Sequence, residues 1–540
     1  YIPSGLDLMM ALLLPLALEV LMPRAPHATM LRLHARAPPR PRARSSRRSI
    51  LSMRVAAPSN SAFERWAEDK GISAEKLRLQ DFDGERGVGA TAALQRGERI
   101  LAVPSQLALQ VTTTQRTPGW LSEDSLWQTS PWHHRLALTL LHEESKRGES
   151  ELQPWLAVLP RSFSTPIFWT DAELARLDYA PVVEAVEAQR DEWDGLVSKL
   201  QRQPPSGLKV DKDSLYRALS VVRSRSFSGP YAGGTFKGSL LQLFLVSTIA
   251  AISTLTGGNA ELALDGFLGF AVYILANDLF FSRGTNAKRY VLCPFIDMMN
   301  HASSRAATDV AYEYFTDKFA VVLDDTPVKQ GEESKICYGP RSNDALLQYY
   351  GFIEESNPHD TFQVNQQDFL VSLAQVSPYD PAHVRSLASE ALPPSMVFTP
   401  RGVDDTAFRI TRLVLFPSEA AAGRGLAQLP LSHELEVMRA LAAIAKSFSA
   451  RFAPAGSGVG FAESSAMPKQ GAKNFKKSPI DRTAAIVASF RSEKSKLLAS
   501  SGKALLELAA KCEEEGMLIQ PNSDDKSESI SLRFGLTKIS

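Results

Sequence analysis

The chain has 540 residues, more than one compact domain usually holds, so we expect two or more domains. Hydrophobic residues make up 44% and charged residues 22%, the composition of an ordinary globular protein. The formal net charge of +1 gives no electrostatic argument for nucleic acid as the main partner. The three cysteines, Cys293, Cys337 and Cys512, stand far apart, which fits a reducing compartment and excludes a disulfide scaffold or a multi-cysteine zinc cluster.

Residues 1–60 have the composition of a disordered targeting leader. Only Asp7 and Glu19 are acidic there, whereas nine arginines between Arg24 and Arg54 stand among Pro, Ala and Ser. An Arg-rich, Ser-containing and acid-poor segment is typical of an organelle transit peptide. The sequence therefore predicts delivery to an organelle.

An apolar run at residues 8–22 precedes these arginines. It is shorter than the ~20 residues of a comfortable membrane span. We interpret it as the apolar core of a signal sequence, the arrangement expected for plastids reached through the secretory route. The alternative is a later start at Met9, Met10 or Met30, and a start at Met30 would leave a simple transit peptide.

The first segment after the leader, residues 63–71, predicts a short amphipathic helix. Gly84, Gly87 and Gly89 then permit a tight backbone path. A β pattern follows and ends at residues 100–104, where a proline closes it. No helix and acidic residue follow in the Rossmann arrangement, which argues against dinucleotide binding.

The next region is predominantly helical in its periodicity. Residues 132–146 and 171–200 are expected to form helices, and Thr170 or Asp171 is the expected N-cap of the second. Residues 215–227, with the sequence LYRALSVVRSRSF, are expected to form a further helix.

Residues 238–281 form an apolar hairpin pattern in which two nearly uncharged arms flank the turn sequence TGGN. Each arm approaches the ~20 residues of a membrane span without clearly exceeding it. If the flanking segments share one domain, the hairpin crosses a membrane either twice or not at all. The flanking basic residues would then lie on one side; they are Lys237, Arg283, Lys288 and Arg289. A hairpin buried against protein or against a partner explains the pattern equally well.

The C-terminal part of the chain consists mainly of helical patterns. They include residues 431–452 and a long helix at about 481–515, separated by a Gly/Ser/Lys-rich linker at 455–477. The tail beyond Pro521 is polar, although residues 530–539 have some strand character.

The most informative segment is residues 295–352. It begins FIDMMNHASS, continues through strand-forming residues and ends SKICYGPRSNDALLQYYGF. Alone, Asn300-His301 and Tyr338-Gly339-Pro340 are each compatible with an ordinary turn. Their order and spacing, and the final Gly351-Phe352, resemble the catalytic core of the SET-domain protein methyltransferases.

More narrowly, the chain is similar to plastid lysine methyltransferases of the Rubisco large-subunit methyltransferase type over about residues 63–515. The resemblance implies an α+β fold with a SET-domain β core and pseudoknot-like threading, a helical insert and an all-α C-terminal substrate-binding domain. The SET domain would span 61–352 and contain the helical insert at about 119–215 and the apolar hairpin at 238–281. The substrate-binding domain would span 353–520, and a tail would follow at 521–540. The segments that carry it are RGVGATAALQRGE, LPRSFSTPIFW, RSRSF, IDMMNHAS and YGPRSND with YYGF.

Methyl transfer to a lysine requires a deprotonated amine in line with the methyl donor. The amine has a pKa of roughly 10.4 in water, so a dry channel lined by tyrosines favours its neutral form and orients its lone pair. Neither a metal nor a general-base carboxylate is required. The resemblance makes Tyr338 the tyrosine nearest the transferred methyl, with Tyr312 and Tyr350 lining the lysine channel. Tyr349 and Tyr350 cannot both face that channel, because neighbouring residues on a regular element point apart.

The resemblance implies S-adenosylmethionine as the cofactor. The main chain of Glu85, Arg86 and Gly87 would lie along it. Asn300 would hold its amino-acid end, and the backbone of His301 would meet its adenine, so we expect no titrating imidazole.

The RSRSF segment contributes a further expected contact. Arg225 would lie near the cofactor or substrate, with Phe227 packed beside it. The alternative for Arg223 and Arg225 is an exposed helix face. Cys293 and Cys337 match no ligand spacing, and we interpret both as small core residues.

The sequence thus predicts an S-adenosylmethionine-dependent protein-lysine N-methyltransferase. Its partner would be a plastid protein, the Rubisco large subunit or another, and the chain would be monomeric, with no nucleic acid or metal. We expect it in the plastid stroma or on the stromal face of a plastid membrane, with contact through 238–281 left open. The hairpin is a departure from the family pattern that leaves the substrate open. The alternatives are a catalytically silent scaffold in a plastid complex and a protein-histidine methyltransferase.

Overall fold

The computed structural model falls into two compact units, which are described separately. The larger comprises Asn60–Gly229, Arg289–Tyr312 and Lys318–Ser540, and the smaller includes Pro230–Lys288 and Glu313–Asp317. Residues 1–59 of the predicted leader lie outside the described residues, and its last residue, Asn60, begins a helix. The structure describes residues 60–82, 84–112, 115–121, 124–202, 204, 208, 210–229, 246–252, 254–257, 259, 261, 265–270, 272, 288–303, 308–313, 316–323, 327–376, 395–417, 429–453, 479–515, 517–520 and 535–538.

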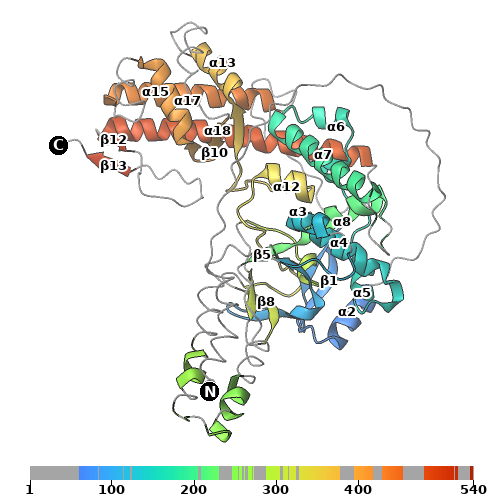
Figure 1. Ribbon diagram of the computed structural model, residues 1–540. Helices are drawn as coiled ribbons and strands as arrows, with labels where there is room; N and C mark the ends of the chain where they lie inside the picture. Colours follow the sequence, from blue (N-terminus) through green and yellow to red (C-terminus); the bar gives the residue numbers. More distant parts are fainter. Residues whose placement is uncertain are drawn as a thin grey trace. The chain divides into compact units, whose positions relative to one another are not determined.

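The expected core of short strands is present in the larger unit as small antiparallel sheets (Figure 1). In each, alternating or continuous apolar residues supply the buried faces. The helix α2 (Asn60–Asp69) precedes them and buries Phe63 and Trp66. The sheets are β1 (Leu77–Phe82) with β2 (Glu85–Ala90); β3 (Arg99–Pro104), β8 (Lys318–Leu323) and β7 (Thr308–Glu313); and β4 (Leu109–Thr112), β6 (Arg289–Leu292) and β5 (Phe227–Gly229).

The three glycines of the predicted tight path differ in their function. Gly84 has φ +90 and turns the chain between β1 and β2, where a side chain would be strained. Gly87 and Gly89 lie within β2 itself, opposite Gln80 and Arg78 of β1. Their lack of a Cβ therefore allows close approach of neighbouring groups rather than a turn.

The helical insert follows β4. Thr170 forms the predicted N-cap as part of a capping box with Glu173. The single helix expected at 171–200 is two helices, because the chain turns at Asp178, where φ is +52. Phe227 belongs to β5 rather than to the preceding helix. The helices are α3 (Asp124–Thr129), α4 (Trp132–Ser145), α5 (Gln153–Val158), α6 (Asp171–Ala175), α7 (Ala180–Arg202) and α8 (Lys212–Arg225).

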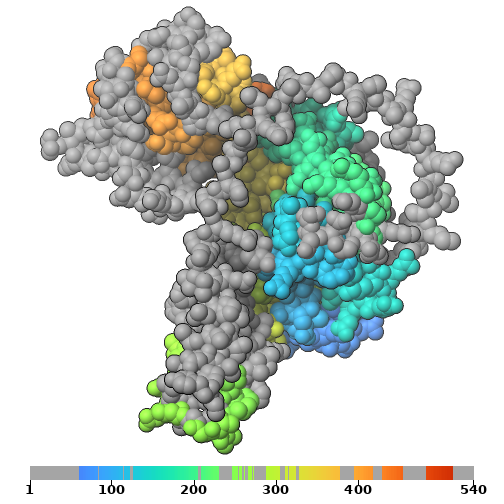
Figure 2. Space-filling model, in the orientation of Figure 1, coloured from blue at the N-terminus to red at the C-terminus, as the bar shows by residue number. Residues whose placement is uncertain are grey.

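In the space-filling view, the helices of the insert and the N-terminal strands form one continuous surface (Figure 2). Beneath it, α4 and α8 contribute several completely buried side chains, among them Leu136, Leu140 and Leu219. Trp193 of α7 stands edge-on to Tyr216 of α8, with ring centroids 5.2 Å apart. The apolar periodicity of these helices therefore reflects a shared core.

The segment after β6 lies beside a later part of the chain. The amide of Ile336 donates to the carbonyl oxygen of Asn300 at 2.9 Å, and the amide of Ala302 donates to Ile336 at 3.2 Å. This parallel bridge joins residues that are more than thirty positions apart in sequence. The helix α12 (Asn343–Tyr350) then begins at the Ser342 cap and ends at Gly351, whose φ is +79.

The C-terminal region contains long helices around a large apolar core. The helices α17 (Leu431–Phe452) and α18 (Pro479–Glu515) lie side by side (Figure 1). Residues such as Phe408, Leu441 and Phe490 are almost fully buried between the elements of this region. Its other helices are α13 (Gln366–Val376) and α15 (Asp405–Leu415). The predicted linker at 455–477 lies outside the described residues.

The expectation that this region is entirely helical needs one correction. It also contains a three-stranded antiparallel sheet in which Val364 faces Met396, and a two-stranded pair toward the C-terminus. The strands are only two to five residues long, which gives too little periodicity to distinguish them from helix ends. They are β9 (Phe362–Asn365), β10 (Ser395–Thr399), β11 (Gly402–Val403), β12 (Met517–Gln520) and β13 (Gly535–Lys538).

The smaller unit contains the described parts of the apolar hairpin. Gly257, with φ +93, lies at the predicted turn. Large apolar side chains on both arms face solvent, and the described atoms are visible at the surface in light green (Figure 2). Within the described residues, no helix is both long enough and apolar enough to cross a membrane. The exposed side chains are Ile249 (63%), Ile252 (55%), Leu255 (87%), Leu268 (51%) and Val272 (66%).

Candidate active site

Tyr338 lies at the centre of an aromatic stack that joins the two ends of the informative segment. Its ring centroid is 4.9 Å from that of His301 and 4.8 Å from that of Tyr350, with interplanar angles of 23° and 22°. The Tyr338 hydroxyl donates to the carbonyl oxygen of Met299 at 2.8 Å. The parallel bridge at Ile336 and the last residue of α12 position the two tyrosines. The structure therefore brings three of the predicted site residues together.

Burial raises the pKa of Tyr338 well above its usual value, and this outweighs the opposing charge of Arg225. Burial also raises the pKa of Tyr350. Both phenols are therefore protonated at neutral pH, and Tyr338 acts as a hydrogen-bond donor rather than as a phenolate base. The same burial means that a group beside these rings is partly removed from water.

The imidazole of His301 is a fixed structural group. Its Nδ1 accepts from the Tyr338 amide at 3.1 Å, so the ring proton lies on Nε2, which faces Ser303 Oγ at 3.1 Å and Glu354 at 3.5 Å. Burial lowers the pKa of His301 despite the nearby Glu354 carboxylate. The ring is therefore neutral near pH 7, in agreement with the expectation that it does not titrate there.

Asn300 links the Asn-His segment to β2. Its Nδ2 donates to the carbonyl oxygen of Arg86 at 3.1 Å and to Glu333 Oε1 at 2.7 Å. A Cβ at Gly87 would lie 2.1 Å from the same Glu333 oxygen, so a side chain there would displace the Glu333 carboxylate. The structure thus brings Arg86, Gly87 and Asn300 together. Glu333 was missed, because nothing in the pattern GEESK distinguishes it from a surface carboxylate.

Two arginines surround Asp297 and form what we call the arginine cluster (Arg86, Asp297 and Arg225). Arg225 Nη1 donates to the Asp297 carbonyl and lies 3.6 Å from its carboxylate. Trp155 Nε1 donates to Asp297 Oδ1 at 3.3 Å, and Arg86 Nη1 donates to the carbonyl of Val158 at 2.8 Å. Arg225 therefore points inward, and the alternative of an exposed helix face does not apply to it.

Burial dominates the electrostatics of the arginine cluster. It raises the pKa of Asp297 although Arg225 and Arg86 oppose the shift. It lowers the pKa of Arg86, and the charge of Arg225 adds to that effect. Asp297 was missed as a functional candidate even though it lies inside the IDMMNH motif, because its two arginines come from distant parts of the chain.

Three other predicted residues have different surroundings. Tyr312 on β7 packs against Phe319 and beneath Arg289, each at 5.5 Å. Phe319 also contacts Phe227 at 5.6 Å. The side chain of Glu85 is exposed and forms an ion pair with Arg482 of α18, so only its main chain remains available for the expected role.

The neighbouring tyrosines diverge as expected from their adjacent positions. Tyr350 stacks on Tyr338, whereas the Arg223 guanidinium lies 3.8 Å from the centre of the Tyr349 ring. The core interpretation of the cysteines is correct for Cys293, which is buried, and wrong for Cys337, which is exposed. In the extended segment before Tyr338 side chains alternate, and there Ile336 takes the buried position.

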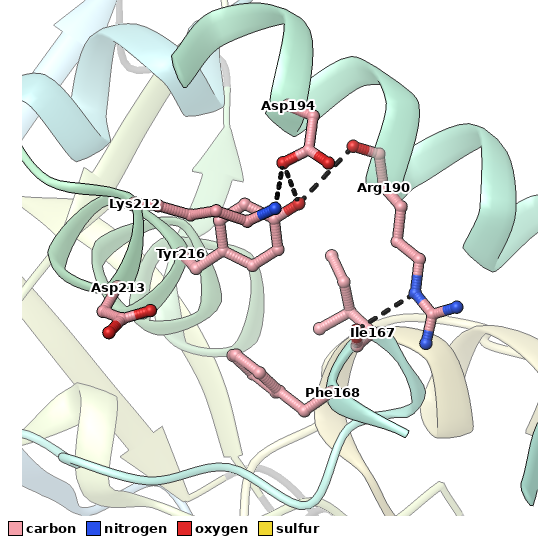
Figure 3. A pocket seen from close by; sticks show the side chains of 7 residues that line it. All are labelled: Ile167, Phe168, Arg190, Asp194, Lys212, Asp213 and Tyr216. Atoms are coloured by element: carbon pink, nitrogen blue, oxygen red, sulfur yellow. Dashed lines mark hydrogen bonds and ion pairs between the residues drawn. The ribbon is translucent and has the colours of Figure 1, made fainter. Parts of the chain in front are cut away.

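A pocket of about 260 Å³ lies among the helices of the insert and contains none of the predicted site residues (Figure 3). Asp194 accepts from the Tyr216 hydroxyl at 2.8 Å and pairs with Lys212 at 2.6 Å. The close-up shows Arg190 directed to the backbone of Ile167 at the other side. Asp194 and Lys212 are thus paired with each other, and Arg190 pairs with Asp171 outside the pocket, an arrangement typical of a structural junction.

The residues around Tyr338 fit a ligand that carries both charges, as S-adenosylmethionine does. Arg225 Nε and Ser226 Oγ are buried and have no hydrogen-bond partner in the described part of the chain. Such groups favour a ligand carboxylate. The Arg86 carbonyl and the Glu333 carboxylate, both contacts of Asn300, are acceptors suited to an ammonium group.

No protein-family model matches the chain. Among curated proteins, it is 25% identical over 308 residues to an actin-histidine N-methyltransferase of Drosophila melanogaster, covering 55% of this chain and 50% of that protein. It is 24% identical over 312 residues to the chloroplastic [fructose-bisphosphate aldolase]-lysine N-methyltransferase of Arabidopsis thaliana, covering 55% and 52%. It is 23% identical over 345 residues to Protein SET DOMAIN GROUP 40 of the same plant, covering 60% and 64%. The chain thus spans between half and two thirds of the length of these relatives.

Among solved structures, Rubisco LSMT bound to AdoMet matches with a TM-score of 0.50 at 18% identity, covering 85% of this chain and 93% of that one. The same protein bound to sinefungin and monomethyllysine gives the same values. The chain therefore has the fold of this SET-domain methyltransferase, as the order of its motifs predicted.

Proposed function

We propose that this chain, a SET-domain protein with the fold of Rubisco LSMT, is an S-adenosylmethionine-dependent protein-lysine N-methyltransferase. One observation carries the proposal: Tyr338 is stacked between His301 and Tyr350 next to the Asn300 contacts with Arg86 and Glu333. These groups come from separate parts of the sequence, and together they provide a buried tyrosine beside donors and acceptors for a charged cofactor.

The cofactor would be held by residues that surround Asn300. Arg225 and Asn300 would meet its amino-acid end, the main chain of Glu85, Arg86 and Gly87 would lie along it, and the His301 backbone would meet the adenine. When bound, S-adenosylmethionine supplies the electrophilic methyl group. The buried donor Nε of Arg225, without a partner among the described residues, supports this assignment.

The tyrosines would prepare the nucleophile. A lysine amine beside Tyr338 and Tyr350 would be partly desolvated, which lowers its pKa and favours the neutral, reactive form. Both phenols stay protonated because burial raises their pKa values, so their hydroxyls can orient the amine without removing its proton. Tyr312 would complete the channel from β7.

We assign the SET domain to 61–352, with the helical insert at about 119–215, and the substrate-binding domain to 353–520. The apolar residues that α13, α15, α17 and α18 bury together form the centre of the second domain, and this core extends to Trp169, Val182 and Leu347 of the first. The protein substrate would be a plastid protein, with the Rubisco large subunit and aldolase as the first candidates, because relatives and structural neighbours carry these names. The chain would act as a monomer.

The test is methylation of a plastid extract by the purified full chain with radiolabelled S-adenosylmethionine. We expect a labelled protein band that Tyr338→Phe and Asn300→Ala each reduce strongly. Tyr349→Phe is the matched control, because that neighbouring ring faces Arg223 instead. Absence of any labelled band from the parent protein would contradict the proposed activity, and labelling unaffected by either substitution would contradict the site.

A second candidate is methylation of a protein histidine. It is favoured by the relatives named actin-histidine N-methyltransferase. Hydrolysis of the labelled band distinguishes the two, since the label would appear in methyllysine in one case and in methylhistidine in the other. Cofactor binding without any labelled product would favour the remaining alternative, a catalytically silent scaffold.

We propose a plastid location, in the stroma or on the stromal face of a membrane. The Arg-rich composition of residues 1–60 and a chloroplastic relative support it. Five exposed apolar side chains on 246–272, flanked in sequence by Lys237 and by basic residues at 283–289, favour contact of this hairpin with a lipid surface. Co-sedimentation with anionic vesicles that persists after deletion of 238–281 would contradict the lipid contact.

A further inference from the structure

A second cluster of chemically active side chains lies in the helical insert. His133 and His134 stand in the first turn of α4, and Glu192 lies in the middle of α7. One ligand atom from each residue lies within 4.8 Å of the others. His133 Nε2 is 3.0 Å from Glu192 Oε1, and His134 Nε2 is 3.2 Å from the same oxygen.

These distances match the spacing of ligand atoms around a tetrahedral zinc ion. Zinc binds histidine nitrogen and carboxylate oxygen at ~2.0–2.2 Å, and a tetrahedron with such bonds separates its ligand atoms by roughly 3.3 Å. Both separations from Glu192 Oε1 are close to this value. Two imidazoles and one carboxylate are also a ligand set that zinc uses with a fourth position open.

The second observation is that His134 Nε2 is buried and makes no well-aligned hydrogen bond among the described residues. The residue is 6% exposed, and its Nε2 meets Glu192 Oε1 at 3.2 Å without hydrogen-bond geometry. A buried polar nitrogen without a well-aligned partner is costly. A metal ion between the two atoms would bind both.

We propose that His133, His134 and Glu192 form a binding site for a divalent transition-metal ion, zinc in the first instance, that joins α4 to α7. Glu192 is 42% exposed at its side chain, so the fourth position is open to water. The three ligands lie outside the Tyr338 stack, and the ion therefore stabilises the helical insert without taking part in methyl transfer.

The competing explanation is a metal-free hydrogen-bonded group. The start of α4 carries partial positive charge that favours a carboxylate there, and the cation Arg223 lies close enough to lower the pKa of His133. Both features stabilise Glu192 without a metal.

The test uses the purified full chain stripped with a chelator and then titrated with Zn²⁺ or Co²⁺. We expect one tightly held ion at this site, intense visible absorption of a tetrahedral Co²⁺ complex, and a Tm higher by several degrees in saturating Zn²⁺. His134→Ala and Glu192→Gln should each abolish the Co²⁺ spectrum and the Tm shift. His359→Ala is the control, because His359 is an exposed histidine outside the cluster.

Circular dichroism of each variant shows whether it remains folded. The Co²⁺ spectrum of the parent protein is a measurement that needs no variant. A parent protein with no Co²⁺ absorption and an unchanged Tm in Zn²⁺ overturns the proposal. So does a spectrum that persists unchanged in both folded variants.

Discussion

The larger unit contains two buried charged clusters whose pairing differs. The arginine cluster places Arg86 and Arg225 around the single carboxylate of Asp297, beside Tyr338. A second group, the lysine cluster (Lys494, Asp344 and Asp360), connects α18 to α12 and to the start of β9. There Lys494 Nζ lies 2.6 Å from Asp344 and 2.8 Å from Asp360, and it donates to the Thr361 carbonyl at 2.6 Å.

The difference shows which cluster is prepared for a ligand. The lysine cluster surrounds one ammonium with three oxygens, and although burial opposes it, the two carboxylates raise the pKa of Lys494. The arginine cluster has two cations for one anion, and Arg225 Nε lacks a hydrogen bond within the described residues. In the lysine cluster Asp344 Oδ1 also lacks a hydrogen bond, but it lies 2.6 Å from the Lys494 ammonium. A cation enclosed by acceptors suits a structural connection, whereas an excess of positive charge with an unused donor suits an anionic ligand group.

The largest expected effect is on the lysine cluster. Lys494→Met leaves two buried carboxylates without their cation, since Lys494 is fully buried. Removing one partner from a buried ion pair destabilises a protein by about 3–5 kcal/mol. Chemical denaturation followed by fluorescence should show this loss in the free energy of unfolding.

Lys503→Met is the matched control, nine positions further along the same helix. Lys503 is 77% exposed and pairs with Glu507, which is 67% exposed. Exposed pairs contribute about 0–1 kcal/mol, so the control should stay close to the parent protein. Equal stability of the two variants would show that the lysine cluster is not a structural connection.

The second prediction concerns the arginine cluster. Arg225→Met should weaken binding of S-adenosylmethionine about tenfold to hundredfold, because a hydrogen bond to a charged group contributes about 1.5–3 kcal/mol. Calorimetric titration with the cofactor measures this. Arg223→Met, from the same helix, removes a contact with Tyr349 instead. If both variants lose affinity equally, the unused donor of Arg225 is not a ligand contact.

This contrast also explains which site residues the sequence could predict. Asn300, His301, Tyr338 and Tyr350 belong to short contiguous motifs, and the structure brings them together. The residues that contact them cannot be identified from one sequence, because they lie far away along the chain and approach only when the protein folds. Glu333 is 33 positions from Asn300, for instance.

The same reasoning applies to the fold. A helix at residues 431–452 was predicted with the bounds that the structure shows, because six turns of helical periodicity make a strong pattern. Lys494 has the sequence neighbourhood of a solvated lysine, and only the arrival of Asp360, 134 positions away, gives it a buried partner. The strands β9 to β11 were missed because each is short enough to be read as part of a helix or loop.

A smaller effect is expected from pH at His301, whose ring stacks on Tyr338. Burial lowers its pKa below the unfolded value of about 6.5. As the pH falls below about 6.5, the unfolded chain takes up a proton that the folded chain does not, so stability declines on the acid side. His301→Asn should remove this pH-dependent loss of stability.

The measurement is the free energy of unfolding of both proteins between pH 8 and pH 5. The difference between parent and His301→Asn should narrow as the pH falls. His433→Asn provides the control, because that histidine lies on α17 and is not among the groups that shift the pKa of His301. A constant difference across the range would mean that the His301 ring is not held neutral by burial.

The smallest effect on stability is expected from chemical labelling of the cysteines. The labelling rates report how readily the surroundings of each cluster open. Cys337 is exposed, whereas Cys293 and Cys512 are fully buried. The carbonyl of Cys293 accepts from the Asp297 amide at 3.0 Å, and burial raises the pKa of its thiol. Native labelling with a maleimide should therefore modify Cys337 first and change stability by less than about 0.5 kcal/mol.

The buried thiols become reactive only when their surroundings open. Cys512 lies on α18 with Lys494, so Lys494→Met should speed its labelling more than that of Cys293. Arg225→Met should speed the labelling of Cys293 more than that of Cys512, because it loosens the packing around Asp297. Peptide mass mapping over time gives each rate. Equal acceleration of both thiols in both variants would show that the two clusters open as one unit, and the distinction between a structural cluster and a ligand-binding cluster would then rest on cofactor affinity alone.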